Sequence, residues 1–115
     1  MAKYHYTTVD GYKAISSQLD WTFRAAKPPG PHPVGAYFTL LPPNTLRLCS
    51  KLLIPRAKVE CVFEFSGGED LLPLDGGRGQ HIVYSPADYM VSRASGRQSY
   101  AGRSNEHPTV ARGQP

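Results

Sequence analysis

The stretch KYHYTTVDGYKAI, residues 3–15, contains two patterns that decide how the chain begins to fold. Aromatic and polar residues alternate in KYHYT, which predicts a strand over Lys3–Thr7. Thr8 is a suitable helix cap. The apolar residues that follow recur at helical spacing, at Val9, Tyr12, Ile15 and Leu19. A helix over about residues 9–18 is therefore expected despite Gly11.

The rest of the chain consists of short patterns separated by turn-forming residues. AKPPGPHPVG, residues 26–35, has four prolines and two glycines and is expected to be a loop. KVECVFEF, residues 58–65, alternates most clearly and predicts a strand with one apolar face. A helix is expected in NTLRLCSKLLI, with Leu46, Cys49 and Leu53 on one face and Pro55 at its end. The other expected elements are an extended LDWTFRA, a strand Ala36–Leu40, an extended LLPL, a strand HIVYS and a final PADYMV.

Charge and composition suggest one small domain followed by a basic tail. Residues 1–92 have nine Lys or Arg against eight Asp or Glu, whereas residues 93–115 have four against one. Hydrophobic periodicity ends near Ser92, so the prediction is an α+β domain at 1–92 with two short helices and a disordered Ser/Gly/Arg-rich segment at 93–115. The domain shows no basic stripe of the kind that marks a nucleic-acid surface.

The sequence has no pattern typical of a disulfide framework, a metal site, a membrane span or a secretion signal. Cys49 and Cys61 have no CxxC spacing and are predicted to be free thiols, although a single disulfide remains an alternative. The four histidines have no ligand spacing, so no metal is expected. No apolar run approaches the ~20 residues that span a bilayer, which predicts no membrane insertion. The N-terminus has no secretion signal, so the protein is expected in the cytoplasm or exported within a larger polypeptide.

Two polar positions on predicted strands are candidate site residues. Alternation places His5 on the strand face opposite Tyr4, together with Thr7, and places Tyr37 on the same face as Thr39. Taken alone, a histidine or a tyrosine in a strand is most often structural. A threonine two residues after each of them favours a polar surface.

Four segments together carry a resemblance to a known family. YHYTTVDGYKAI, PPGPHPVGAYFTLLPP, KVECVFEF and GRGQHIVYSPADYMV are similar to the HYD1 family of ADP-ribosyltransferase domains, named for a His–Tyr–Asp signature. The similarity covers Tyr4–Val91. The family occurs at the tips of polymorphic toxins and in short stand-alone proteins. The resemblance implies a small split β-sheet that binds NAD+ as its substrate, without a metal.

The resemblance also implies a role for each signature position. NAD+ loses nicotinamide through a transition state that resembles an oxocarbenium ion. His5 would bond the ribose hydroxyls and Tyr37 would pack against nicotinamide. Asp88 would stabilise the developing positive charge, with Glu64 as the alternative acid. The positions implied for binding the rest of NAD+ are Tyr4, Thr7, Gly35, Phe38, Thr39 and His81.

Backbone groups of residues 77–79 and of the proline loop are expected to border this cleft. His32 and His107 are expected to be solvated. The sequence has neither a GxGxxG turn nor a P-loop, so NAD+ would not bind as it does in a doubly wound fold.

The acceptor of ADP-ribose is left open by the sequence. A protein, a nucleic acid, a small molecule or water would all use the same cleavage step, and water would make the protein an NAD+ glycohydrolase. If the chain is a toxin domain, an immunity protein is the expected partner. Two alternatives remain: a non-catalytic module that binds NAD+, ADP-ribose or a partner, and an RNA 2′-phosphotransferase. The latter is disfavoured because Lys3, Lys58 and Arg78 are few and scattered.

Overall fold

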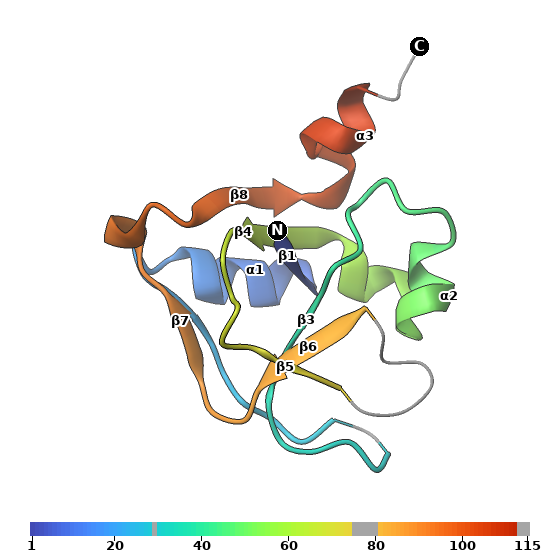
Figure 1. Ribbon diagram of the computed structural model, residues 1–115. Helices are drawn as coiled ribbons and strands as arrows, with labels where there is room; N and C mark the ends of the chain where they lie inside the picture. Colours follow the sequence, from blue (N-terminus) through green and yellow to red (C-terminus); the bar gives the residue numbers. More distant parts are fainter. Residues whose placement is uncertain (29, 75–80, 113–115) are drawn as a thin grey trace.

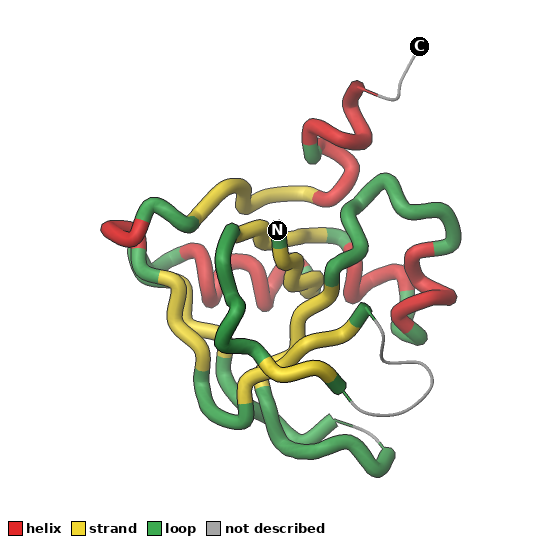
Figure 2. Tube along the Cα trace, viewed as in Figure 1, coloured by secondary structure: helices red, strands yellow, loops and turns green. Residues whose placement is uncertain are grey.

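The computed structural model describes residues 1–28, 30–74 and 81–112 and confirms the α+β class (Figures 1 and 2). A six-stranded antiparallel sheet has the order β5-β6-β3-β1-β4-β8, and β2 pairs separately with β7. The elements are β1 (Lys3–Thr7), α1 (Val9–Ser16), β2 (Trp21–Phe23), β3 (Ala36–Thr39), α2 (Leu48–Leu52), η1 (Arg56–Val59), β4 (Cys61–Phe65), β5 (Leu72–Pro73), β6 (Ile82–Ser85), β7 (Tyr89–Val91), η2 (Arg93–Ser95), β8 (Gln98–Arg103), η3 (Ser104–Glu106) and α3 (Pro108–Arg112).

β1 lies at the centre of the large sheet, and its two neighbours pair with it to very different extents. β4 pairs with β1 along its whole length, from Lys3↔Phe65 to Thr7↔Cys61. β3 pairs with β1 only at Tyr4↔Thr39. The sheet therefore splits between β1 and β3, and this opening positions the candidate site.

α1 forms where the sequence predicted it and is two residues shorter. The side chain of Thr8 caps it by accepting a hydrogen bond from the Gly11 amide at 3.1 Å. Tyr12 and Ile15 pack against the core. Gly11 is needed because a Cβ there would lie 2.1 Å from the hydroxyl oxygen of Thr7. A small residue thus lets the helix lie close to β1, and this close approach explains a glycine within a helix.

The hydrophobic core lies on one face of the large sheet, covered by α1 and by the β2–β7 ribbon. Phe23 of β2 meets Phe38 and Phe63 edge to face, with ring centroids 5.1 and 5.6 Å apart. Tyr89 and Val91 of β7 complete this layer. The short extended segment at LDWTFRA and the final PADYMV are therefore paired strands that close the core.

The C-terminal segment belongs to the fold, which corrects both the expected domain boundary at residue 92 and the expected disorder after it. β8 (Gln98–Arg103) pairs with β4 and forms the edge of the large sheet. The sequence pattern missed this strand because an edge strand is held by backbone hydrogen bonds and tolerates polar side chains. Residues 113–115 lie outside the described residues.

Arg97 anchors this segment to the core. Its Nε donates to the Ser66 carbonyl at 2.8 Å, and a terminal nitrogen donates to the Tyr89 hydroxyl at 2.8 Å. The Tyr89 hydroxyl in turn donates to the Asp70 carboxylate at 2.9 Å. The guanidinium also lies 5.5 Å from the centroid of the Phe65 ring. An arginine that the sequence placed in a disordered tail is thus part of a packed network.

The second helix differs from its prediction. α2 covers only Leu48–Leu52, and the residues flanking it, Arg47 and Leu53, have left-handed backbone conformations. The face expected to be buried is not formed, since Leu46 is 82% exposed and Leu53 is 59% exposed. The described residues form three short α-helices, whereas two were expected.

Among the described residues, no helix is long and apolar enough to cross a membrane.

The role of Arg97 predicts a specific loss of stability. Arg97→Ala should lower the free energy of unfolding by about 1–3 kcal/mol, because the variant lacks two side-chain hydrogen bonds and a cation–π interaction. Urea denaturation at neutral pH measures this change. The matched control is Arg93→Ala, which removes an exposed arginine and should change the stability by less than about 0.5 kcal/mol. Equal stabilities of the two variants would show that the C-terminal segment is not anchored.

Candidate functional site

The imidazole of His5 bridges the split between β1 and β3. Its Nδ1 lies 3.1 Å from the backbone carbonyl oxygen of Tyr37. Because a carbonyl oxygen only accepts, Nδ1 must carry the hydrogen of this bond. The ring also packs against three core phenylalanines, with centroids 4.8 Å from Phe23, 5.7 Å from Phe38 and 6.5 Å from Phe63. The His5 side chain thus binds a backbone carbonyl of β3 at a position where β1 and β3 have separated and no longer pair through their backbones.

The surroundings of His5 favour its neutral form. Burial lowers the pKa of His5 below its usual value, and the hydrogen bond to Tyr37 opposes this effect only in part. In the neutral ring with its hydrogen on Nδ1, Nε2 is an acceptor. No hydrogen bond to Nε2 is present within the described residues, and every buried polar side-chain atom there has a partner. No described residue therefore uses the acceptor capacity of Nε2, and His5 is one of the residues that line the pocket described below.

A pocket of about 550 Å³ opens at this split, a size typical of sites for small molecules and cofactors. Six of the nine residues predicted as site residues line it: Tyr4, His5, Thr7, Tyr37, Phe38 and Thr39. The lining residues that the sequence did not single out are Tyr6, Thr8, Pro28, His32, Leu52, Ile54, Lys58, Leu74 and Ile82. Pro28 and His32 belong to the proline loop, which was expected to border the cleft. The others come from β1, α2, η1, β6 and connecting segments, so no local pattern identifies them as a set.

The two signature side chains approach the pocket from different sheet faces. The pair Tyr4↔Thr39 places these two side chains on one face, so alternation puts Tyr37 there as well and His5 on the other. The face of His5 is the core face, where Lys3 is also buried. The expected polar surface around His5 is therefore wrong. The ring reaches the pocket because the strands have separated beside it.

Tyr37 is half-buried and held at both ends. Its hydroxyl donates to the carbonyl oxygen of Pro33 in the proline loop, and its ring stacks on Tyr84 with centroids 5.4 Å apart and planes 15° apart. Burial, and secondarily the neighbouring Tyr84, raise the pKa of Tyr37. The ring is thus neutral and fixed in orientation. A ligand ring that enters the pocket would contact the side of Tyr37 that Tyr84 does not cover.

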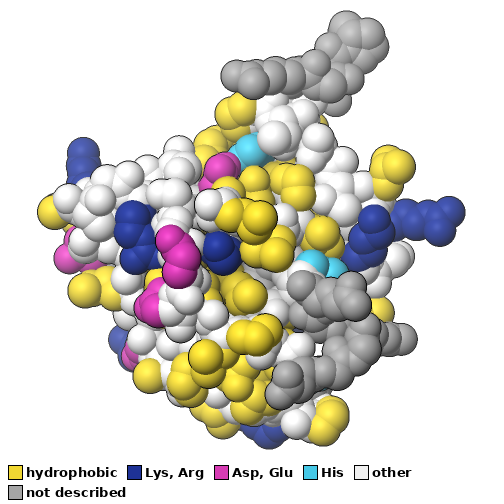
Figure 3. All heavy atoms as spheres, in the orientation of Figure 1, with side chains coloured by type: hydrophobic (Ala, Val, Ile, Leu, Met, Phe, Trp, Pro, Cys, Tyr) yellow, Lys and Arg dark blue, Asp and Glu magenta, His cyan; other side chains and the backbone are white. Residues whose placement is uncertain are grey.

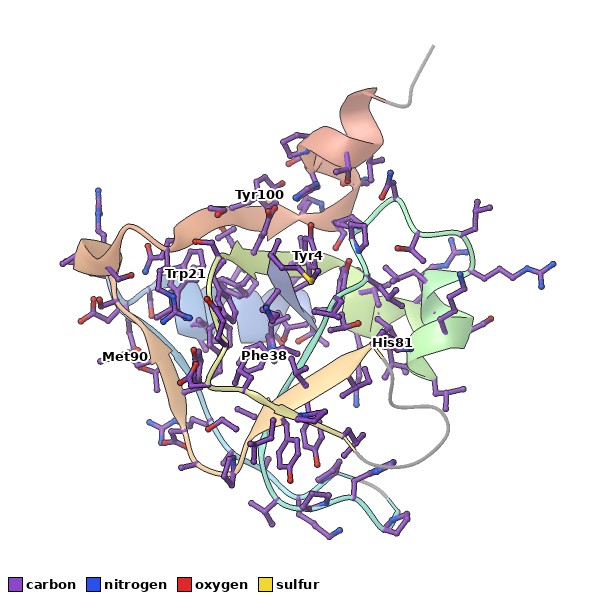
Figure 4. All side chains as sticks on the ribbon, in the orientation of Figure 1. Tyr4, Trp21, Phe38, His81, Met90 and Tyr100 are labelled. Atoms are coloured by element: carbon purple, nitrogen blue, oxygen red, sulfur yellow. The ribbon has the colours of Figure 1, made fainter. Side chains whose placement is uncertain are left out.

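A second set of bonds fixes the opposite edge of the pocket. The Tyr6 hydroxyl donates to the Leu41 carbonyl at 2.8 Å, and burial raises the pKa of Tyr6. The Thr39 hydroxyl oxygen accepts from the Leu41 amide at 3.2 Å and lies 3.1 Å from His81 Nδ1. Thr39 is buried, so its hydroxyl is already engaged within the protein. His81, which immediately precedes β6 (Figure 4), acts here through Thr39 and is not itself part of the lining.

The structure does not bring Asp88 to His5 and Tyr37. Asp88 is exposed, and its carboxylate accepts a hydrogen bond of 2.7 Å from the Ala25 amide. This bond ties the start of β7 to the end of β2, which is a structural role. Within the described residues, no carboxylate lines the pocket.

Glu64, the alternative acid, lies on the same sheet face as Tyr4, outside the pocket lining. Its carboxylate accepts a hydrogen bond of 2.6 Å from Nε2 of His107. Thr109 donates its amide to Nδ1 of the same ring at 3.1 Å. Tyr4 and Tyr100, both labelled in Figure 4, contact His107 edge to face with ring centroids 6.1 and 4.8 Å from it. His107 is therefore buried, contrary to the expectation that it is solvated.

Other predicted features have structural explanations or lie outside the described residues. A Cβ at Gly35 would lie 2.7 Å from the Ser85 carbonyl oxygen, so this glycine permits β3 to approach β6 and is absent from the lining. Cys49 and Cys61 are free thiols. The described residues contain no group of three or more potential metal ligands. Residues 77–79 are not described.

Comparisons with known proteins found no match to this chain among family models, curated proteins or solved structures. The function is therefore argued from the pocket and from its residues.

Burial of His5 predicts a dependence of stability on pH. The folded protein disfavours the charged ring, so the unfolded chain binds more protons once the pH falls below about 6.5. The free energy of unfolding should therefore decrease from pH 7.5 towards pH 5, by at most about 1.4 kcal/mol per pH unit from this one group. Urea denaturation at several pH values measures the slope.

Two histidine substitutions test the origin of this slope, one at His5 and a matched control at His32. His5→Gln should flatten it, because the group that titrates is gone. His32→Gln should leave it unchanged, since His32 is exposed in the proline loop. The same slope in His5→Gln and in the unmodified protein would assign the effect to another group.

Proposed function

We propose that the protein binds NAD+ in this pocket and cleaves it, as an ADP-ribosyltransferase or, with water as acceptor, an NAD+ glycohydrolase. The observation that carries the proposal is the split between β1 and β3, where the bridging His5 and Tyr37 both line a pocket of about 550 Å³. These are the two residues to which the resemblance to HYD1-type domains assigns contacts with ribose and nicotinamide. If the chain acts as a toxin, an immunity protein would cover the same pocket.

His5 supports the proposal through the hydrogen-bonding state of its ring. The bond from Nδ1 to the Tyr37 carbonyl orients the ring, and Nε2 is left as a neutral acceptor without a hydrogen bond from any described residue. A ribose has hydroxyl groups that donate to such an acceptor. His5 would thus hold the nicotinamide ribose while remaining uncharged, which avoids repulsion of the cation that develops on the sugar.

The apolar part of the lining supports the binding of a flat ring. Tyr6 and Tyr37 supply aromatic surface, and Leu52, Ile54 and Ile82 supply aliphatic surface. Stacking and burial of a nicotinamide ring would be favourable in such surroundings. The position of Tyr37 is independent of the ligand, because Tyr84 and the proline loop already hold it.

In the proposed reaction, the bond between the nicotinamide nitrogen and ribose C1 breaks. The electron pair of this bond leaves with nicotinamide, which becomes neutral. An oxygen or nitrogen of the acceptor then bonds C1 and releases its proton to solvent. The main requirement on the protein is to hold the dinucleotide in position and to stabilise positive charge at C1.

A second candidate function is a module that binds NAD+ or ADP-ribose without cleaving it. The observation that favours it is the lack of a carboxylate among the described lining residues, because a carboxylate would stabilise the cation. The RNA 2′-phosphotransferase alternative has less support. Lys58 is the one lysine or arginine in the described lining, and that reaction brings two phosphate-bearing substrates together.

The cleavage proposal predicts release of nicotinamide from NAD+, measured by chromatography with and without candidate acceptors. His5→Gln should reduce the rate at least tenfold by removing the acceptor at Nε2. Tyr37→Ala should reduce it similarly, whereas Tyr37→Phe should retain most activity because the ring stays. Binding of NAD+ by calorimetry without any release would support the binding module instead. If the protein neither binds NAD+ nor releases nicotinamide from it, both functions are excluded.

The two acids are distinguished by substitutions that remove charge while keeping shape. Asp88→Asn retains an oxygen that can accept from the Ala25 amide, and Glu64→Gln retains one for His107. Since neither carboxylate lines the pocket, both variants should keep activity within about threefold. A loss of a hundredfold or more in one variant would identify that residue as the stabilising acid, at the scale seen when one electrostatic group is removed.

A further inference from the structure

Five exposed basic side chains lie on or next to α2, η1 and the end of β8, and we call them the basic wall: Arg47, Lys51, Arg56, Lys58 and Arg103. Four of them come from residues 44–59, a segment without a single Asp or Glu. Figure 3 shows Lys and Arg side chains projecting from the side of the molecule that carries α2. The fifth comes from β8, which lies beyond the boundary that the sequence suggested.

These side chains are not used by the fold. None of the five forms a side-chain hydrogen bond within the described residues, and the one pair of a basic group with a carboxylate closer than 4.0 Å there is His107–Glu64. By contrast, Lys3, Lys27 and Arg97 donate to backbone carbonyls. The wall therefore presents cations whose charge is not neutralised by neighbouring carboxylates.

The wall connects two hollows. η1 carries Lys58, which lines the NAD+ pocket, and Arg56, which lines a second hollow of about 240 Å³. Arg103, Ser104 and Asn105 line the second hollow from the C-terminal side, and Glu60 is its one acidic residue. Arg56 and Arg103 both line this small hollow, and arginine is suited to phosphate because it binds phosphate oxygens through two parallel hydrogen bonds.

We propose that the basic wall binds single-stranded nucleic acid, with a phosphate in the second hollow and the strand leading to the pocket. Five cations with Glu60 as the one acid lining the hollow between two of them suit a backbone that carries a charge at every nucleotide. If the proposed NAD+ cleavage is correct, a nucleic acid on the wall becomes the acceptor of ADP-ribose. That last step rests on the proposed function, whereas binding by the wall does not.

The test is fluorescence anisotropy with labelled 12-nucleotide RNA and DNA strands, at 50 and 200 mM salt and without NAD+. We expect binding at 50 mM salt that weakens steeply at 200 mM. The triple variant Lys51→Gln, Arg56→Gln and Arg103→Gln should bind at least tenfold more weakly. The slope of log affinity against log salt should fall by about 2, near 0.7 for each phosphate that the variant no longer neutralises. Lys58 is kept, because it lines the NAD+ pocket.

The matched control is Lys13→Gln, Arg24→Gln and Arg93→Gln, which removes the same charge from positions elsewhere on the molecule. It should bind within threefold of the unmodified protein. If both triple variants lose the same affinity for the strands, the effect depends on net charge alone and the proposal is overturned. The absence of binding at 50 mM salt would also overturn it. Binding of a poly-glutamate peptide with equal affinity and equal sensitivity to the wall variant would overturn it in favour of an acidic protein. Circular dichroism melting checks that both variants fold.

The binding step and the reaction are separated by a second measurement. The same strands are incubated with NAD+ and examined for added mass. Binding without added mass would retain the wall and count against transfer to nucleic acid. Nicotinamide release without binding of the strands would retain the cleavage activity and overturn the wall.

Discussion

The structure around the site depends on one hydrogen bond, from Nδ1 of His5 to the backbone carbonyl of Tyr37. β1 and β3 share a single residue pair and then separate, which leaves backbone groups that a continuous sheet would satisfy. The imidazole spans the gap, and no described residue forms a hydrogen bond with its other nitrogen. The same interaction therefore stabilises the split and orients a polar ring beside the pocket. Burial against the core phenylalanines keeps the ring neutral, which preserves Nε2 as an acceptor.

The C-terminal segment has a comparable role on the other side of the sheet. β8 covers the edge of β4, and Arg97 connects it to the core beneath β7. His107 follows β8 and holds Glu64 on the far face. Arg103 joins the basic wall from the same segment. A stretch rich in Ser, Gly and Arg thus contributes to the stability of the sheet, to the environment of Glu64 and to the surface beside the pocket.

The sequence predicted those elements whose pattern is local. Alternation located β1 and β4, short apolar runs between turn-forming residues located β3 and β6, and Thr8 with the spacing of Tyr12 and Ile15 located α1. The prediction from the sequence was wrong for α2. The face formed by Leu46 and Leu53, expected to be buried, is exposed in the described structure. The prediction was also wrong for β8 because that strand depends on pairing with β4, and pairing leaves no apolar period. Of the candidate site, His5 and Tyr37 were found, whereas Lys58 and Ile54 depend on where loops return in space.

By itself the sequence determined the α+β class, the central strand with a histidine, and the aromatic residues that build the core, because alternation and spacing act within a few neighbouring residues. Only the tertiary structure decided that β1 and β3 separate and that His5 and Tyr37 approach one pocket from opposite sheet faces. It also placed Asp88 at the end of β2, away from both, and Arg103 beside Arg56. These outcomes depend on strand register and on contacts distant along the chain, and a one-dimensional pattern contains neither.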